Sequence, residues 1–348
     1  MGPAVRIDQL TGLRTILAPG RAERPDAFAP TPAESKPDAA EKCPFCEGRE
    51  NRTPPEVWAD RPGGGEPDTP GWRVRSVPNL YPVLGDPEEG EDPAKRESGL
   101  TSSIDPLRTA ARGAEPDLFS SQPATGAHEV IVNCPQHATS LGQLSDEELA
   151  VAIEGWRERM RAHPDAAYLH LIVNEGPAAG ASLEHSHAQL YALGFVPAEV
   201  SRERERTRAY HERTLGAHLL GDVAVEEIRR RERLVTIDDD ALLICPWASR
   251  SPFELRVIPR RPAPRFEEDT AGVGMIAAAL RALAGALGSL PQFNLWVRTA
   301  PHGAQEFCWH VDLVPRLTTR AGFELGTAVD INVYPPEKAA ADLRAALG

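Results

Sequence analysis

Residues 174–189 read NEGPAAGASLEHSHAQ, and they are the most informative stretch of the chain. The stretch begins as a turn rich in glycine and alanine and ends in a His-x-His-x-Gln pattern formed by His185, His187 and Gln189. Successive side chains of a β-strand point to opposite faces, so an extended chain places all three polar groups on one face. A single histidine is most often a hydrogen-bonded core residue, but two histidines and a glutamine in register are hard to explain by packing. We therefore predict a functional site on this strand.

The pattern suits the transfer of a phosphoryl or nucleotidyl group. A neutral imidazole, whose ordinary pKa is about 6.5, can attack phosphorus and form a phosphoramidate that stays reactive. We assign this attack to His187, whose other ring nitrogen then needs a fixed acceptor, commonly a backbone carbonyl, to select the tautomer. Gln189 would donate to a phosphate oxygen, and the small residues 180–182 would let backbone amides approach it.

A C-x-x-C knuckle, Cys43-Pro44-Phe45-Cys46, is the second chemical motif. This spacing indicates zinc binding or thiol redox chemistry, and two buried free cysteines are the simplest alternative. A redox motif normally opens a helix after a strand, whereas this one follows a proline-rich loop, which favours zinc. Structural zinc takes four ligands, and the further candidates are His137 and His185, with His128 in reserve. Zinc on His185 would orient the strand of His187 without touching the substrate.

Composition and charge exclude several classes of function. The 348 residues could form one large domain or two ordinary ones, and no apolar stretch approaches the roughly twenty residues of a membrane span. The N-terminus lacks the features of a secretory signal, and five cysteines do not suggest a disulfide framework, so we expect a cytoplasmic protein. A net charge of -13 disfavours nucleic acid as a partner, because its phosphates require many Lys and Arg side chains.

The two halves of the chain show the same order of predicted elements. A capping box at Ser145-Asp146-Glu147-Glu148 begins an amphipathic helix that continues to Met160. The other elements that we predict are strands at 129–132, 168–173, 187–195, 253–258, 293–297 and 309–314 and a helix at about 269–287. This order indicates an α+β fold built from two diverged copies of one unit, each an antiparallel sheet with packed helices.

Three segments are predicted to lie outside these units. Residues 18–42 and 84–125 are rich in proline, glycine, alanine and charge, and we predict long, partly disordered loops there. Residues 201–233 are dense in arginine and glutamate, which predicts one exposed, salt-bridged helix that links the two copies.

These motifs resemble the galactose-1-phosphate uridylyltransferase family, a branch of the histidine-triad superfamily. The resemblance spans nearly the whole chain, and its stretches are Cys-Pro-Phe-Cys at 43–46, Pro-Asn-Leu-Tyr-Pro at 78–82, His-Glu-Val-Ile-Val through Pro-Gln-His at 128–137, the 174–189 stretch, and Phe-Glu-Leu-Gly-Thr at 323–327. It implies two tandem histidine-triad-like units, which we place at residues 1–200 and 201–348. It also implies a homodimer that completes each site with residues of the other chain. The implied reaction is a ping-pong exchange, in which a nucleotide sugar passes its nucleotidyl group to His187 and a sugar 1-phosphate collects it.

The resemblance also implies roles for individual residues. Gln189 matches the residue that steadies the transferred phosphate beside the nucleophile His187. The matching zinc ligands are Cys43, Cys46, His137 and His185. The matching substrate contacts are Arg21, Arg24, Asn79, Asn174, Ser182 and Glu324. The two arginines would supply the local positive charge that the overall balance lacks.

Departures from the family pattern leave alternatives open. Ser186 stands between the two histidines, where well-studied members have proline, and this serine resembles a plant-type branch, ADP-glucose phosphorylase, that uses inorganic phosphate as acceptor. A histidine-triad hydrolase that uses water, or a non-catalytic protein that binds nucleotide sugars or metal, are further alternatives. A second metal site of some relatives is reduced here to Glu203, His302 and His310, so we expect one zinc ion per chain.

Overall fold

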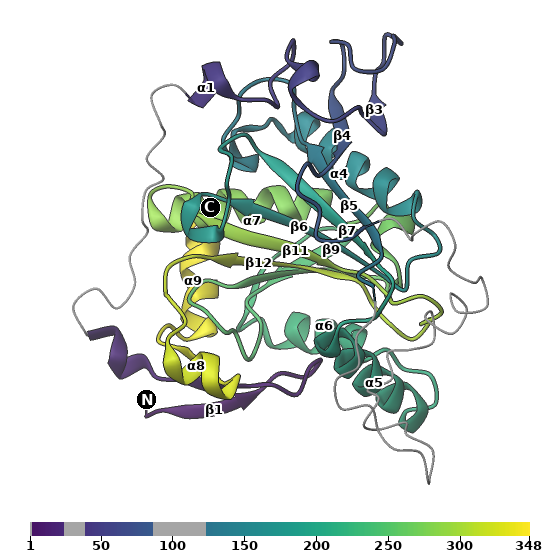
Figure 1. Ribbon diagram of the computed structural model, residues 1–348. Coiled ribbons are helices and arrows are strands. Elements are labelled where there is room, and N and C mark those ends of the chain that lie inside the picture. Colours follow the sequence, from purple (N-terminus) through teal and green to yellow (C-terminus); the bar gives the residue numbers. More distant parts are fainter. Residues whose placement is uncertain (1, 24–38, 86–122) are drawn as a thin grey trace.

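A ten-stranded antiparallel sheet forms the centre of the protein (Figure 1). The computed structural model describes residues 2–23, 39–85 and 123–348, so most of the two predicted loops lies outside the described residues. The strands lie in the order β3-β4-β5-β7-β6-β11-β12-β10-β9-β8. Their bounds are β3 Trp58–Asp60, β4 Val74–Pro78, β5 Gly126–Val132, β6 Tyr168–Glu175, β7 His187–Leu193, β8 Leu234–Ile237, β9 Ala241–Ile244, β10 Leu255–Pro259, β11 Phe293–Arg298 and β12 His310–Pro315.

Helices and a second, smaller sheet surround this centre. The α-helices are α1 Ala39–Lys42, α4 Asp146–Arg161, α5 Ala198–Arg213, α6 Leu219–Arg230, α7 Val273–Leu287, α8 Gly322–Thr327 and α9 Pro336–Leu347. The short 3-10 turns are η1 Pro19–Glu23, η2 Glu50–Arg52, η3 Leu141–Gln143, η4 Pro177–Ala179 and η5 Phe266–Glu268. The small sheet has the order β1-β2-β13, with β1 Ala4–Ile7, β2 Arg14–Leu17 and β13 Asp330–Asn332. Within the described residues, every helix is too short or too polar to cross a bilayer.

The predicted repetition is visible in the order of the elements. The series β5, α4, β6, β7 in the first half corresponds to β10, α7, β11, β12 in the second. The two halves meet where β6 pairs with β11, with Asn174 opposite Asn294, and this pair joins them into one sheet. The α+β class and its antiparallel pairing are thus confirmed, whereas the boundary at residue 200 stays a prediction.

Each face of the large sheet has a distinct character. The helices α4 and α7 cover one face, and on β7 the side chains of Ala188 and Leu190 belong to their apolar core. Because side chains alternate, His187 and Gln189 point to the opposite face, so the reactive pattern lies on the side of the sheet away from these helices.

Two predicted helices differ from the structure. Residues 201–233 form α5 and α6 rather than one helix, because Leu215 and Gly216 between them both adopt positive φ values of 58° and 116°. Each helix also buries one stripe of side chains, so neither is fully exposed. The helix predicted from residue 269 begins at Val273, because the Asp269 carboxylate accepts from the next two amides and Gly272 is left-handed.

Candidate functional site

The turn that leads into β7 depends on glycine. Gly176 adopts a φ of 83°, and a Cβ at this position would lie 2.4 Å from the side chain of Gln292. Asn294 holds the turn against β11, because its amide nitrogen donates to the Asn174 side chain and to the Ala179 carbonyl, at 2.8 Å each. Ser182 follows on the exposed part of the turn. The small residues of this stretch therefore serve a close backbone approach.

The His187 imidazole is held in a single tautomer. Its Nδ1 lies 2.7 Å from the His185 carbonyl oxygen, and because a carbonyl only accepts, Nδ1 carries the proton and Nε2 is left unprotonated. The side chain is only 6% exposed, and this burial lowers the pKa of His187, so the ring is neutral at pH 7. The expected backbone acceptor is thus confirmed, and the ring has the form that a nucleophile needs.

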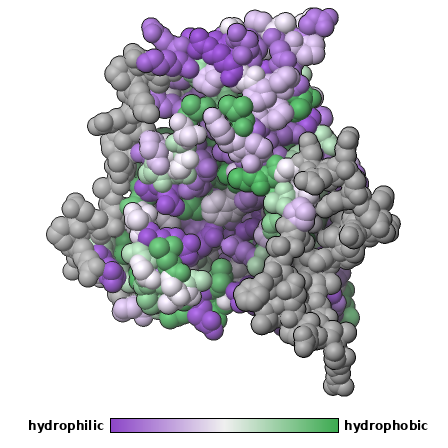
Figure 2. Space-filling model, in the orientation of Figure 1, coloured by the Kyte–Doolittle hydropathy of each residue, from purple (hydrophilic) through white to green (hydrophobic). Residues whose placement is uncertain are grey.

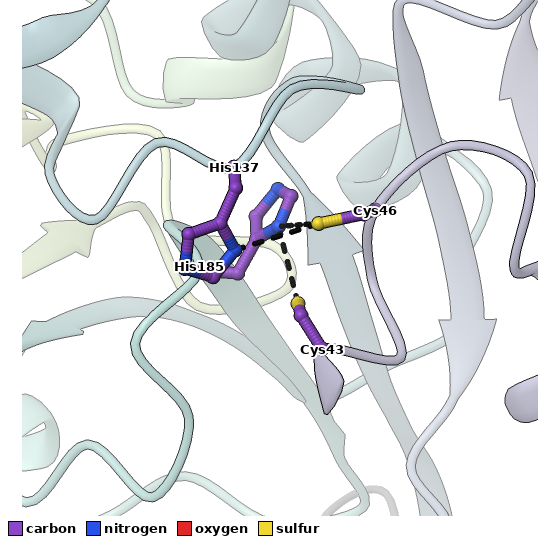
Figure 3. Close-up of side chains that lie close together, drawn as sticks. All are labelled: Cys43, Cys46, His137 and His185. Atoms are coloured by element: carbon purple, nitrogen blue, oxygen red, sulfur yellow. Dashed lines mark hydrogen bonds between the residues drawn. The ribbon is translucent and has the colours of Figure 1, made fainter. Parts of the chain in front are cut away.

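Four side chains from three parts of the chain converge beside this strand (Figure 3). The Nδ1 of His185 lies 3.5 Å from the Cys43 Sγ, and the Nδ1 of His137 lies 3.4 Å from the Cys46 Sγ. All four donor atoms lie within 4.8 Å of one another, so this cluster could hold a metal ion. The Cys134 carbonyl accepts from Nε2 of His185 at 2.9 Å, which turns Nδ1 toward the thiols.

Phe45 connects this cluster to His187. Its ring contacts the rings of His185 and His187, with centroid distances of 6.1 and 5.3 Å. The middle of the C-x-x-C knuckle therefore packs directly on the histidine that we expect to react, and any loosening of the knuckle would reach that ring.

His128 lies beside Gln189 and outside the metal cluster, so its interpretation as a reserve ligand is wrong. Its Nε2 is 3.1 Å from the Gln189 Oε1 and 3.1 Å from the Asn79 Nδ2. Tyr191, on the same face of β7, donates its hydroxyl to the same Gln189 oxygen at 3.0 Å. The structure thus brings together two predicted substrate contacts, Asn79 and Gln189, through an imidazole whose place the sequence did not reveal.

Other predicted contacts lie elsewhere in the chain. Glu324, on α8, accepts from the Ala321 amide at 3.0 Å and so caps its own helix, and Arg21 is exposed in η1. Arg24 lies outside the described residues. In Figure 1, α8 lies beside β1 at one end of the molecule, and α1, which leads into the knuckle, lies at the other.

The remnants of a second metal site form an ion-pair cluster instead. Glu203 lies 3.3 Å from the Arg298 guanidinium, and His310 lies 3.6 Å from Asp312. His302 is not part of this group, and Cys43, Cys46, His137 and His185 form the only set in the described ranges that could hold a metal ion.

Sequence reasoning missed a buried network beside the start of β7. The Ser186 hydroxyl accepts from the Asn133 amide at 3.1 Å and donates to the Glu175 carboxylate at 3.2 Å. Trp156 of α4 donates to the other end of Asn133 at 2.8 Å. Ser186 drew notice only as a departure from the family pattern, and nothing in the sequence marked Asn133.

The surface is hollowed in more than one place. Figure 2 shows a hydrophilic hollow in the middle of the visible face. A separate cavity of about 460 Å³ lies between α4 and α7, and it is lined by Glu175 but not by His187 or Gln189. We place the chemistry at His187 and not at this larger cavity, because the cavity walls carry no histidine or cysteine.

Comparisons with known proteins cover most of the chain. The family model described as galactose-1-phosphate uridyl transferase, N-terminal domain, matches residues 99–197. ADP-glucose phosphorylase of Arabidopsis thaliana is 28% identical over 356 residues, which is 98% of this chain and 92% of the relative. Galactose-1-phosphate uridylyltransferase of Neurospora crassa is 27% identical over 69% of this chain and 74% of its own length. The crystal structure of the Arabidopsis thaliana ADP-glucose phosphorylase with bound ADP-glucose superimposes with a TM-score of 0.76 at 25% identity, covering 99% of both chains.

Proposed function

We propose that the chain is a nucleotidyltransferase, because it is similar in sequence and in fold to galactose-1-phosphate uridylyltransferases and to ADP-glucose phosphorylase. It would exchange a nucleoside monophosphate between a nucleotide sugar and a sugar 1-phosphate through a covalent nucleotidyl-histidine. A role in galactose metabolism follows if the acceptor is galactose 1-phosphate.

The observation that carries the proposal is the fixed tautomer of His187. The lone pair on Nε2 attacks the phosphorus next to the nucleoside, a P–N bond forms, and the P–O bond to the sugar phosphate breaks. Nδ1 keeps its proton throughout, and the His185 carbonyl, 2.7 Å away, stabilises the positive charge that the ring gains. An oxygen of the acceptor phosphate then attacks the same phosphorus, and the P–N bond breaks to restore the neutral imidazole.

Zinc is the metal that we propose for the Cys43, Cys46, His137 and His185 cluster, one ion per chain. With Zn–S of about 2.3 Å and Zn–N of about 2.1 Å, a tetrahedral ion places each S···N pair about 3.6 Å apart. The measured S···N distances are 3.4, 3.5 and 3.7 Å, so the four side chains fit this ion. A bound zinc ion neutralises paired thiolates, and through His185 and Phe45 the four ligands would hold the nucleophile's strand in place.

A homodimer is the second part of the proposal. Glu324 and Arg21 resemble substrate contacts, yet both adjoin the small β1-β2-β13 sheet, whereas His187 lies on β7 of the large sheet. Both residues would therefore serve the His187 of a second copy. We also propose a cytoplasmic location, which agrees with five free cysteines.

One specific observation favours a second candidate reaction. The relative named ADP-glucose phosphorylase matches the chain over almost its whole length, in sequence and in structure. In this alternative, the nucleotide is adenylyl and inorganic phosphate is the acceptor, while the first step on His187 is unchanged.

The test is to incubate the protein with UDP-glucose or ADP-glucose and to detect the adduct by mass spectrometry. We expect one added UMP or AMP per chain, lost again on addition of galactose 1-phosphate or inorganic phosphate. His187→Ala should abolish the adduct while the thermal unfolding curve is kept. His170→Ala, on the same face of neighbouring β6, is the matched control and should label normally. An adduct on the His187→Ala protein would refute the proposal.

A further inference from the structure

Gln189 can help the transfer only if its amide points the right way. A glutamine side chain presents an oxygen acceptor at one corner and a nitrogen donor at the other, and a half-turn about the last bond exchanges them. A phosphate oxygen is stabilised by the nitrogen and repelled by the oxygen. Whatever fixes this orientation therefore contributes to the reaction.

Two donors converge on the oxygen of Gln189. The Tyr191 hydroxyl lies 3.0 Å from Oε1, and the His128 Nε2 lies 3.1 Å from it. His128 and Tyr191 also stack on each other, with ring centroids 4.2 Å apart, so the two donors form one rigid unit. With its oxygen bound from two sides, the amide presents its nitrogen elsewhere.

Donors lie near both ring nitrogens of His128. The Val83 amide, which can only donate, lies 3.4 Å from Nδ1, and the Asn79 Nδ2, also a donor, lies 3.1 Å from Nε2, so each ring nitrogen faces a donor. Burial lowers the pKa of His128, so the ring is neutral, and a proton on Nε2 would face the Gln189 oxygen at 3.1 Å. The backbone of Asn79 also donates to the His128 carbonyl at 2.8 Å, which ties the 78–82 segment to the same residue.

We propose that His128 is a positioning residue, which donates from Nε2 to the Gln189 oxygen and thereby aims the Gln189 amide nitrogen at the transferred phosphate. This inference rests on the proposed function, in which Gln189 contacts that phosphate. His128 itself does not touch the substrate. Its loss frees the amide to turn, which leaves the binding of the nucleotide sugar intact and slows the transfer.

A double-mutant cycle tests this role. Removal of one donor to a developing negative charge typically slows a reaction by about 10² to 10³-fold, which sets the ceiling for Gln189→Ala. We expect His128→Ala to lower kcat of exchange by about 10- to 100-fold, within that ceiling, with little change in KM. His128→Gln, which keeps a nitrogen donor near the Nε2 position, should restore most of the loss. In the Gln189→Ala background, His128→Ala should have no further effect.

Two further measurements separate this inference from the proposed function. His170→Ala removes a neighbouring ring, whose centroid lies 6.5 Å from the centroid of the Tyr191 ring, and it should leave kcat unchanged. NMR of protein labelled with 15N-histidine reports the His128 tautomer without any substrate, and we expect the Nε2–H form. An Nδ1–H form, or full additivity of His128→Ala and Gln189→Ala, would overturn the role of His128. Full activity of Gln189→Ala alone would instead count against Gln189 as the phosphate contact.

Discussion

The Glu175 carboxyl is buried, which disfavours its charged form, and the effect of replacing it by glutamine can be predicted. It lies at the end of β6, only 5% exposed, and accepts from the Ser140 hydroxyl, the Leu141 amide and the Ser186 hydroxyl. These hydrogen bonds favour the charged form, but burial outweighs them and raises the pKa of Glu175 to about 7. We expect Glu175→Gln to stabilise the protein at pH 8.

The size and sign of the effect follow from the two protonation states. In the unfolded chain the pKa of a glutamate is about 4.3, and each pKa unit of difference corresponds to about 1.4 kcal/mol. Below pH 4 both states are protonated and the carboxyl has no effect. Between pH 4 and pH 7 the unfolded state loses its proton first, so the free energy of unfolding falls by about 3 to 4 kcal/mol and then stays constant. Glutamine at position 175 removes this decrease.

Urea unfolding of both proteins at pH 5, 6, 7 and 8 provides the measurement. The difference in unfolding free energy between variant and wild type cancels every other titrating group, including the metal ligands. We expect this difference to rise by about 2 to 3 kcal/mol in favour of Glu175→Gln from pH 5 to pH 8. Glu158→Gln, at an exposed position of α4, should give a flat difference. If the unfolding free energies of Glu175→Gln and wild type change in parallel with pH, the carboxyl does not titrate in this range, and the reasoning is refuted.

Two further predictions concern the metal and the oligomer. Cys43→Ser should lower the zinc content, measured by metal analysis, from one ion per chain to near zero, and it should slow exchange by about 10- to 100-fold. Cys245 is a buried cysteine outside the cluster, so Cys245→Ser should change neither the zinc content nor the exchange rate. His187→Ala and Glu324→Ala should each be inactive alone, but unfolding and refolding them together should restore part of the activity, because a mixed dimer contains one intact site. No recovery in a mixture that light scattering shows to be dimeric would count against a shared site.

The sequence alone was sufficient for features that depend on local spacing. The capping box at Ser145 and the C-x-x-C knuckle are short patterns with one physical meaning each, and both occur as expected. The tautomer of His187 could also be predicted, because its acceptor, the His185 carbonyl, is only two residues away. In these cases the groups that interact are neighbours in the chain.

Features that depend on strand register could not be predicted. His128 faces Tyr191 across the β5–β7 pair, and the pairing register that brings these two rings together cannot be read from the short segment His128-Glu129-Val130-Ile131-Val132. As a result, His128 was kept in reserve as a metal ligand, whereas the structure places it beside Gln189. The break between α5 and α6 was missed for another reason. Leu215 adopts a left-handed conformation, which leucine rarely does, so its residue type does not predict a break there.

The second half of the sheet differs from the first at the positions that correspond to His187 and Gln189. β12 corresponds to β7, and its residues His310 and Asp312 point to the face that carries His187 and Gln189 in the first half. There, however, the Asp312 carboxylate accepts from the Arg256 guanidinium at 2.6 Å, and burial holds the pKa of His310 well below its ordinary value. The space left among these groups is about 20 Å³, enough for about one water molecule and far too small for a nucleotide. Paired charges occupy this part of the second half, so we expect substitutions at His310 to affect stability more than exchange.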